Sequence, residues 1–222
     1  MKHTPEKPLR VVILISGRGS NMQALAECVQ AEHLPVQICG VISNRPEAAG
    51  LAWAQAQGLP AYALSHHAFP TRDAFDTALQ AQLDALAPDY ILLAGFMRVL
   101  GTSLVRHFEG QIINIHPSLL PVFPGLHTHQ QALAQGVQWH GCTVHYVTPV
   151  LDHGPIIAQG VIPVHHDDTP DTLATRLLPV EHALYTQVLR WLAQDRVTLL
   201  ADGRVQVRDQ PHRAWAGPNL FN

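Results

Sequence analysis

The hydrophobic and polar positions of the chain fall into blocks that predict strands separated by helices. Residues 11–15 are a continuous apolar run, followed by a glycine-containing turn and the helical stretch MQALAECVQAEH. A buried strand, a turn and a helix in this order are typical of the first unit of a parallel α/β sheet. The same rhythm predicts further strands at 36–43, 61–64, 90–94 and 111–115, and helices at 47–57 and from a Thr71 cap to 87.

The second half of the chain has a different pattern. Residues 142–148 and 156–164 are extended runs joined by a short loop, a spacing that favours antiparallel pairing over a parallel crossover. A helix is predicted at 171–194, and VTLL-ADG-RVQV predicts a hairpin that turns on Asp202-Gly203. We therefore expect a doubly wound, mostly parallel, Rossmann-like α/β sheet with an antiparallel extension and a small C-terminal hairpin, in a single domain spanning residues 1–222.

The composition and charge of the chain argue against nucleic-acid-binding and membrane proteins. The chain has 222 residues, of which 47% are hydrophobic and 14% charged, as in an ordinary globular protein. A formal charge of -3 provides no diffuse basic field, so we expect no nucleic-acid partner. The apolar run at 11–15 is far too short for a secretory or membrane segment, so no membrane association is expected either.

The cysteines and histidines argue against disulfides and metals. Cys28, Cys39 and Cys142 are irregularly spaced with no C-x-x-C, which indicates neither a disulfide framework nor a thiolate zinc site and favours the cytoplasm. The chain has 15 histidines, and most are expected to be solvated surface residues. No acidic or cysteine ligands cluster beside them, so no metal is expected.

The turn Ser-Gly-Arg-Gly-Ser-Asn at 16–21 is a candidate anion site. It departs from a dinucleotide fingerprint because Met22 stands at the third glycine position and no acid follows the second strand. It also lacks the Gly-Lys-Ser/Thr of a P-loop. Free amides at a helix N-terminus, with Ser20 and Asn21 as added donors, suit a single phosphate monoester. The alternative is a turn that only connects strand and helix.

Asn114, His116 and Asp152 are candidate catalytic residues. Strand alternation puts Asn114 and His116 on one face of the strand, and Pro117 ends that strand at the edge where ligands bind in open α/β sheets. A carboxylate near His116 would stabilise its imidazolium and orient the ring, while the Asn114 amide could donate to an oxyanion. The alternative for Asp152 is an ordinary turn residue, since spacing alone does not bring it to His116.

This set suits acyl transfer through a tetrahedral intermediate. The sequence contains no G-x-S-x-G elbow and no cysteine with an obvious base nearby. Direct transfer to an external nucleophile is therefore favoured over a covalent enzyme intermediate.

From residue 11 to about residue 185, the sequence resembles the folate-dependent phosphoribosylglycinamide formyltransferase (glycinamide ribonucleotide transformylase) family. The resemblance is carried by GRGSN at 17–21, AGFMRVL at 94–100, INIHPSLLP at 113–121, FPGLHTHQQAL at 123–133, HGCTVHYVTPVLDHGPII at 140–157 and EHALY at 181–185. It implies formyl transfer from 10-formyltetrahydrofolate to glycinamide ribonucleotide in purine synthesis, with the N-terminal half on the ribonucleotide side and the C-terminal half on the folate side.

The resemblance also implies roles for individual residues. Asn114, His116 and Asp152 would be catalytic, with Asn114 also touching the folate. Gly19, Ser20 and Asn21 would hold the phosphate, and Glu181 would reach the ribose hydroxyls or the glycinamide. The folate would contact Arg72 at its glutamate tail, Met97, Arg98, Val99 and Leu100 along its length, and Thr148, Pro149, Val150, Leu151 and Asp152 at its pterin. Taken without the family, Met97 and Leu100 would be core residues, and Arg72 and Glu181 solvated helix charges.

At four residues the family resemblance leaves the role open. His153 stands where a small residue is expected, and Pro149-Val150 stands where acidic residues are expected, so the folate loop departs from the family pattern at these positions. Arg18 either adds positive charge to the phosphate loop or points to solvent.

Rival functions remain at this point. A formyl-folate hydrolase usually carries an N-terminal regulatory domain, whereas ten residues precede the first predicted strand. A methionyl-tRNA formyltransferase would need a C-terminal nucleic-acid-binding domain and a basic surface. A non-catalytic folate or nucleotide sensor would not require the catalytic trio. Only small-molecule substrates are expected as partners, and a monomer and a homodimer are both compatible with the sequence.

Overall fold

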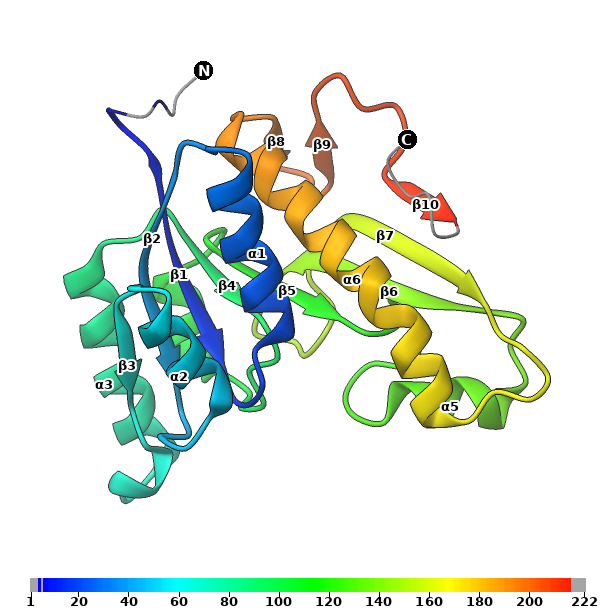
Figure 1. The fold of residues 1–222 in the computed structure, drawn as a ribbon, viewed down its shortest axis with the longest axis horizontal. Helices are drawn as coiled ribbons and strands as arrows, with labels where there is room; N and C mark the ends of the chain where they lie inside the picture. The colour runs from blue at the N-terminus through cyan, green and yellow to red at the C-terminus, as the bar shows by residue number, and fades with distance from the viewer. Residues whose placement is uncertain (1–3, 5, 217–222) are drawn as a thin grey trace. The chain divides into compact units, whose positions relative to one another are not determined.

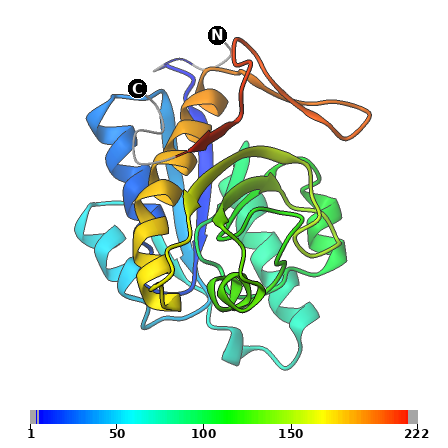
Figure 2. The same ribbon diagram turned by 90° about the vertical axis from the view of Figure 1, so that its right-hand side faces the viewer.

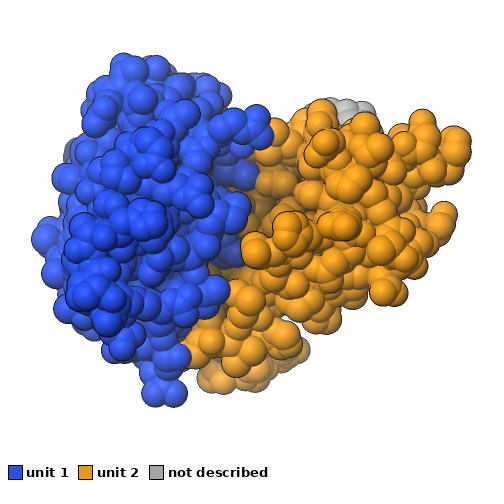
Figure 3. All heavy atoms as spheres, turned by 90° about the horizontal axis from the view of Figure 1, so that it is seen from below, with its two compact units in different colours: residues 1–114 blue, residues 115–222 orange. Residues whose placement is uncertain are grey.

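The computed structural model describes residue 4 and residues 6–216. The chain divides into two compact units, residues 1–114 and residues 115–222, coloured blue and orange in Figure 3. This division does not test the expectation of a single domain, which stays a prediction. The two units are described in turn, with the element labels of Figure 1.

Unit 1 is built on parallel strands. β1 (Leu9–Ile15) pairs with β2 (Val36–Ser43) on one side and with β4 (Tyr90–Leu93) on the other. β2 also pairs with β3 (Ala61–Ala63), and β4 pairs with β5 (Ile112–His116). The apolar residues 11–15 are fully buried, as a strand covered on both faces requires. All five strands predicted in this half are confirmed, with ends that shift by up to two residues.

The helices of unit 1 cover both faces of its strands. Figure 2 shows α1 (Ser20–Ala31) and α2 (Ala49–Ala56) on one side, and α3 (Arg72–Leu86) and α4 (Thr102–His107) on the other. The predicted cap of α3 is confirmed, since Thr71 Oγ1 accepts a hydrogen bond from the Ala74 amide at 3.1 Å. A short 3-10 turn, η1 (His66–Ala68), precedes α3.

Unit 2 combines antiparallel strands with one long helix. β6 (Trp139–Tyr146) and β7 (Ile156–Pro163) are antiparallel, as predicted, and α6 (Pro170–Ala193) packs on both. Thr169 caps α6 through a capping box with Thr172. The predicted hairpin is confirmed as β8 (Val197–Leu199) and β9 (Val205–Val207).

Two elements of unit 2 were not predicted. α5 (Thr128–Gln135) follows the Pro-rich stretch after β5, and β10 (Ala214–Ala216) adds a parallel strand to β7. Among the described residues, hydrogen bonding orders the main sheet β10-β7-β6-β5-β4-β1-β2-β3. β4 therefore lies inside the sheet, which fits its apolar sequence. The predicted fold class, a mostly parallel α/β sheet with an antiparallel extension and a hairpin, is confirmed.

The cysteines are described by their burial and pKa, and the helices by their length and polarity. Cys28, Cys39 and Cys142 are all buried, and burial raises the pKa of Cys39 and of Cys142. Within the described range, the helices are too short or too polar for any of them to traverse a bilayer.

Candidate active site

The end of β5 presents the first two candidate residues. Asn114 and His116 share one face of the strand because side chains alternate along it, and Asn114 is half-buried while His116 is only 6% exposed. β5 ends at His116, directly before Pro117, as predicted.

The ring of His116 has a defined hydrogen on one nitrogen. Its Nε2 lies 2.9 Å from the Phe123 carbonyl oxygen, and because a carbonyl only accepts, Nε2 carries a hydrogen and donates it. The other nitrogen, Nδ1, lies 3.5 Å from Oδ2 of Asp152. An imidazolium form of His116 would therefore direct its second N–H toward a carboxylate.

Asp152 is held by its backbone and by a loop amide. Its φ of 52° is in the left-handed region, which is uncommon for a residue other than glycine. Oδ2 accepts a hydrogen bond from the Gly125 amide at 2.8 Å, and both the His116 and Asp152 side chains are only 7% exposed. The structure thus brings together two of the three predicted catalytic residues within unit 2, and places the third two residues from His116 on β5.

His145 is a neighbour of Asp152 that the sequence reasoning missed. Its Nδ1 donates to the Tyr146 carbonyl at 2.9 Å, and its Nε2 lies 3.8 Å from Oδ1 of Asp152. Burial lowers the pKa of His145, although the Tyr146 hydrogen bond and the Asp152 charge partly oppose this effect. The sequence feature that could have indicated this residue is a histidine on the strand that leads into the Asp152 loop.

A second pair of histidines lies in unit 2, between α5 and β6. His129 Nδ1 and His140 Nε2 are 3.0 Å apart and share one hydrogen, and His140 is 1% exposed. Burial, followed by the charges of His129 and His116, lowers the pKa of His140 to about 4. Burial also lowers the pKa of His129. His140 and His145 therefore differ from the solvated histidines expected for most positions.

The loop after β6 is shaped by Gly154. A Cβ on this residue would lie 1.6 Å from the Tyr146 carbonyl oxygen, so only glycine fits there. Of the residues predicted to meet the pterin, Thr148 is half-buried and its hydroxyl donates to the Val150 carbonyl, while Val150 and Leu151 are exposed and Pro149 is at the surface. His153 bends back on the loop, with Nδ1 donating to the Leu151 carbonyl at 2.9 Å.

Glu181 lies on α6. Its charge contributes to the raised pKa of the buried Cys142 thiol on β6, which indicates that the two residues are close. The side chain is half-buried rather than fully solvated.

In unit 1, the glycine loop leaves the first turn of α1 open. Gly19 precedes α1 with a φ of 72°, and no side chain caps the helix. Ser20 is half-buried and Asn21 buried, while Arg18 is exposed. The Gly50 amide donates to the Gly17 carbonyl at 3.0 Å, and a Cβ on Gly50 would lie 2.6 Å from Cδ1 of Ile15. The loop is therefore packed tightly against the start of α2.

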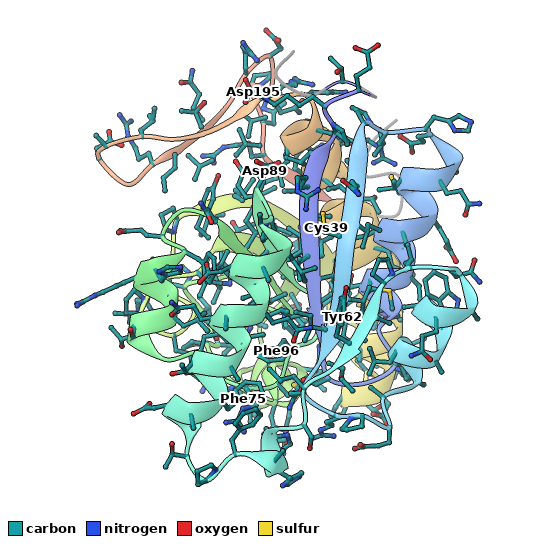
Figure 4. All side chains as sticks on the ribbon, turned by 90° about the vertical axis from the view of Figure 1, so that its left-hand side faces the viewer. Cys39, Tyr62, Phe75, Asp89, Phe96 and Asp195 are labelled. Atoms are coloured by element: carbon teal, nitrogen blue, oxygen red, sulfur yellow. The ribbon has the colours of Figure 1, made fainter. Side chains whose placement is uncertain are left out.

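The segment 97–101 follows β4 and is held at both ends. The Met97 amide donates to Ser16 Oγ, and the Gly101 amide donates to Oδ2 of Asp76, each at 2.8 Å. Between these ends Met97 is 65% and Val99 46% exposed, whereas Leu100 is buried. The Arg98 guanidinium lies 4.7 Å above the ring of Phe75, which is labelled in Figure 4.

Two charged residues of α3, Arg72 and Asp76, interact with each other or with this segment. Arg72 is the first residue of α3, and it contributes with Arg98 to lowering the pKa of the buried Asp76. Burial dominates, so the pKa of Asp76 is raised overall. The predicted folate contacts at Arg72, Met97, Arg98 and Val99 thus all belong to unit 1, either on the segment 97–101 or at the start of the helix that contributes Asp76. No group of three His, Cys, Asp or Glu residues suited to a metal ion occurs among the described residues.

Comparisons with known proteins agree on one family. Residues 9–189 match the family model described as formyl transferase. The chain is 43% identical to the phosphoribosylglycinamide formyltransferase of Escherichia coli (strain K12), over 86% of this chain and 90% of that protein. It is 42% identical to the trifunctional purine biosynthetic protein adenosine-3 of Bos taurus, of which it spans 20%.

Solved structures extend the likeness to the fold. A phosphoribosylglycinamide formyltransferase from Coxiella burnetii, solved in complex with CHES, has a TM-score of 0.87 and 44% identity, over 93% of this chain and 99% of that one. A formyltetrahydrofolate deformylase from Pseudomonas syringae pv. tomato has a TM-score of 0.85 and 30% identity, over 92% of this chain and 67% of that one.

Proposed function

The chain belongs to the phosphoribosylglycinamide formyltransferases of the formyl transferase family, and from this membership we propose that it transfers a formyl group from 10-formyltetrahydrofolate to the amine of 5′-phosphoribosylglycinamide. The products are formylglycinamide ribonucleotide and tetrahydrofolate, and the reaction is a step of de novo purine (IMP) biosynthesis. The observation that carries this proposal is the His116 Nδ1 to Asp152 Oδ2 approach of 3.5 Å, at the end of a strand that also carries Asn114.

The amine attacks the formyl carbon and the carbonyl oxygen becomes an oxyanion. Asn114 and the imidazolium form of His116 donate hydrogen bonds to this oxygen, and the Asp152 carboxylate supports the positive charge of that imidazolium. For His116 to act in this way, the formyl oxygen replaces the Phe123 carbonyl as the acceptor of Nε2–H, because that hydrogen is already engaged. The proton lost by the amine reaches the departing folate nitrogen through His116 or a water molecule.

The remaining residues bind and orient the two substrates. In unit 1, Gly19, Ser20 and Asn21 hold the phosphate at the open first turn of α1, where backbone amides favour anions. The folate lies against Met97, Arg98, Val99 and Leu100, and its glutamate tail reaches Arg72. In unit 2, the pterin meets the 148–152 loop, and Glu181 reaches the ribose or glycinamide. Holding two reactants together is worth about 7–11 kcal/mol in favourable cases.

We further propose that only these small molecules are partners, and that the enzyme works in the cytoplasm without a metal as a monomer or a homodimer. The three buried cysteines, whose spacing suggests no disulfide framework, fit a reducing compartment.

Hydrolysis of formyl-folate is a second candidate, favoured by the likeness to the deformylase structure. One assay distinguishes the two: the protein is incubated with 10-formyltetrahydrofolate, with and without the ribonucleotide, and loss of the formyl group from folate is followed. Turnover that requires the ribonucleotide supports the transferase. Turnover without it indicates the hydrolase, and no turnover in either mixture contradicts both.

A further inference from the structure

A chain of two hydrogen bonds crosses three strand ends in unit 1. The Met97 amide donates to Ser16 Oγ at 2.8 Å, and the Ser16 hydroxyl donates to Oδ1 of Asn44 at 2.5 Å. Ser16 follows β1, Asn44 follows β2, and Met97 lies shortly after β4. The Ser16 hydroxyl, at the start of the glycine turn, therefore links the segment expected to bind folate to Asn44 at the end of β2.

The parallel register explains why these groups meet. β1 lies between β2 and β4, with Ile15 paired to Ser43 and Leu14 to Leu93. Ser16 and Asn44 are each the next residue after these strands, so they stand level at the same sheet edge. Both are almost inaccessible, with 3% and 2% of their surface exposed. Water cannot replace a lost hydrogen-bond partner at such buried positions. The Ser16 and Asn44 side chains must therefore keep the geometry of their hydrogen bond.

Asn44 is itself fixed from the other side. Its backbone carbonyl accepts hydrogen bonds from the His66 amide at 3.3 Å and from His66 Nδ1 at 2.8 Å. Because a carbonyl only accepts, Nδ1 of His66 carries the hydrogen. The Asn44 side chain thus offers Oδ1 to Ser16 from a backbone that cannot move freely.

The segment 97–101, which these hydrogen bonds hold, is ordered and partly exposed, as a binding surface would be. The Gly101 amide at its other end is held by Asp76, so the backbone is fixed at both ends. Between them, Met97 and Val99 remain 65% and 46% exposed although both are apolar. A binding segment that is ordered before the ligand arrives avoids the entropy cost of ordering on binding.

We propose that Ser16 and Asn44 are positioning residues for the formyl-folate, acting through the Met97 amide. The inference rests on the proposed function for its ligand, and it adds two residues with no expected contact to either substrate. It predicts that the folate affinity of the enzyme depends on a hydroxyl located beside the phosphate loop.

Ser43 supplies a matched control. It is 0% exposed and lies at the end of β2, but its hydroxyl donates to the Arg45 carbonyl at 2.9 Å and is not part of the chain to Met97. Ser43→Ala removes a buried hydroxyl at nearly the same place in the sheet. It therefore reports the cost of losing such a hydroxyl without freeing the Met97 amide.

The first experiment measures KM for formyl-folate, KM for the ribonucleotide and kcat in Ser16→Ala, Asn44→Ala and Ser43→Ala. The two positioning variants are expected to raise the folate KM by roughly threefold to tenfold, the range for one lost hydrogen bond, with a smaller change in the ribonucleotide KM. Ser43→Ala is expected to stay within about twofold of the wild type. Equal folate KM values in Ser16→Ala and Ser43→Ala would overturn the proposal.

The double variant tests whether both residues act through one path. If they do, Ser16→Ala combined with Asn44→Ala raises the folate KM no more than the larger single change. Additive effects would overturn the shared path. Should Ser16→Ala fail to fold, Asn44→Ala alone carries the comparison with Ser43→Ala.

Amide hydrogen exchange separates this inference from the proposed function. In the absence of substrates, exchange of the Met97 amide is expected to accelerate in Ser16→Ala and Asn44→Ala but not in Ser43→Ala. Unchanged exchange would overturn the positioning role. If exchange accelerates as expected but the wild type neither transfers the formyl group nor binds tetrahydrofolate, the hydrogen-bond chain stands and the proposed function fails.

Discussion

His116 and Asp152 are held in place by backbone groups only two residues apart in one loop. The Phe123 carbonyl accepts from His116 Nε2, and the Gly125 amide donates to Asp152 Oδ2. Phe123 and Gly125 both have positive φ angles, of 57° and 81°, so the loop turns its carbonyl and its amide toward different side chains. The same short stretch thus orients both members of the pair.

Replacing the carboxylate should test the proposed role of this pair. Asp152→Asn keeps an oxygen that can accept from the Gly125 amide, but it cannot support a positive His116. We expect turnover to fall by at least about a hundredfold, with little change in the thermal midpoint. Asp202→Asn, in an exposed turn where the carboxylate pairs with Arg204, serves as the control and should keep full activity. Near-normal turnover in Asp152→Asn would rule out the proposed role.

Adding a methyl group at Gly154 should distort the loop that carries Asp152. The new Cβ would lie 1.6 Å from the Tyr146 carbonyl oxygen, so the backbone must move. For Gly154→Ala we expect about 1–3 kcal/mol lower stability in urea unfolding, as in overpacked sites, and a higher folate KM. Gly203→Ala is the control, because a Cβ there meets open space and only its φ of 80° causes strain. Equal folate KM values in the two variants would contradict the expectation.

The buried histidines should make the protein less stable as pH falls. The pKa of His140 is about 4 in the folded state, below its ordinary value of 6.5, so the unfolded chain binds a proton that the native state does not. The free energy of unfolding should therefore decrease as the pH falls through 6.5 toward 4. His129 and His145, whose pKa values are also lowered, act in the same direction.

Urea unfolding at pH 7.5 and pH 5 measures this effect. His140→Gln should reduce the difference in unfolding free energy between the two pH values, because one of the titrating groups is gone. His67→Gln, at an exposed position, should leave that difference unchanged. A wild-type difference retained in full by His140→Gln would show that His140 does not contribute.

The stability of the protein should change in different ways when Asp76 loses only its charge, in Asp76→Asn, and when it also loses its hydrogen-bonding oxygen, in Asp76→Ala. Burial raises its pKa, so the charged form destabilises the native state once the pH exceeds the ordinary value of 3.8, and the penalty is complete above the folded-state pKa. Compared with the wild type, Asp76→Asn should gain relative stability as the pH rises from 4 to 8. Asp76→Ala should lose about 1–3 kcal/mol, since the Gly101 amide is left without its acceptor. Chemical unfolding of all three proteins distinguishes these results, and equal stability of Asp76→Asn and Asp76→Ala would contradict them.

The strands of unit 1 could be predicted because buried strands consist largely of apolar residues, which are visible in the sequence. Residues 36–43 are apolar enough that the predicted and observed bounds of β2 agree. α5 carries no comparable signal, since it has eight residues and begins after His127 with no side-chain cap. β10 is only three residues long, and its partner β7 lies far away in the chain. Its place depends on tertiary contacts such as the packing of Trp215 against Trp191.

The candidate site could be predicted where side-chain chemistry marks it, as at Asn114, His116 and Asp152. Their catalytic roles stay predictions. The main-chain partners, Phe123 and Gly125, could not be predicted, because a backbone carbonyl or amide has no signature in the residue type. The hydroxyl of Ser16 was likewise unmarked, because its function depends on the strand register that brings Met97 and Asn44 to it.

The spacing of Phe123 and Gly125 limits which changes in chain length the enzyme can tolerate. A surface loop usually accepts an inserted residue, because nothing depends on its length. Here a single insertion between the carbonyl of Phe123 and the amide of Gly125 would separate the two hydrogen bonds, even though no side chain in the site had changed. The number of residues in this loop is therefore as important to the candidate active site as their identity, and a family alignment should show gaps on either side of this stretch rather than inside it.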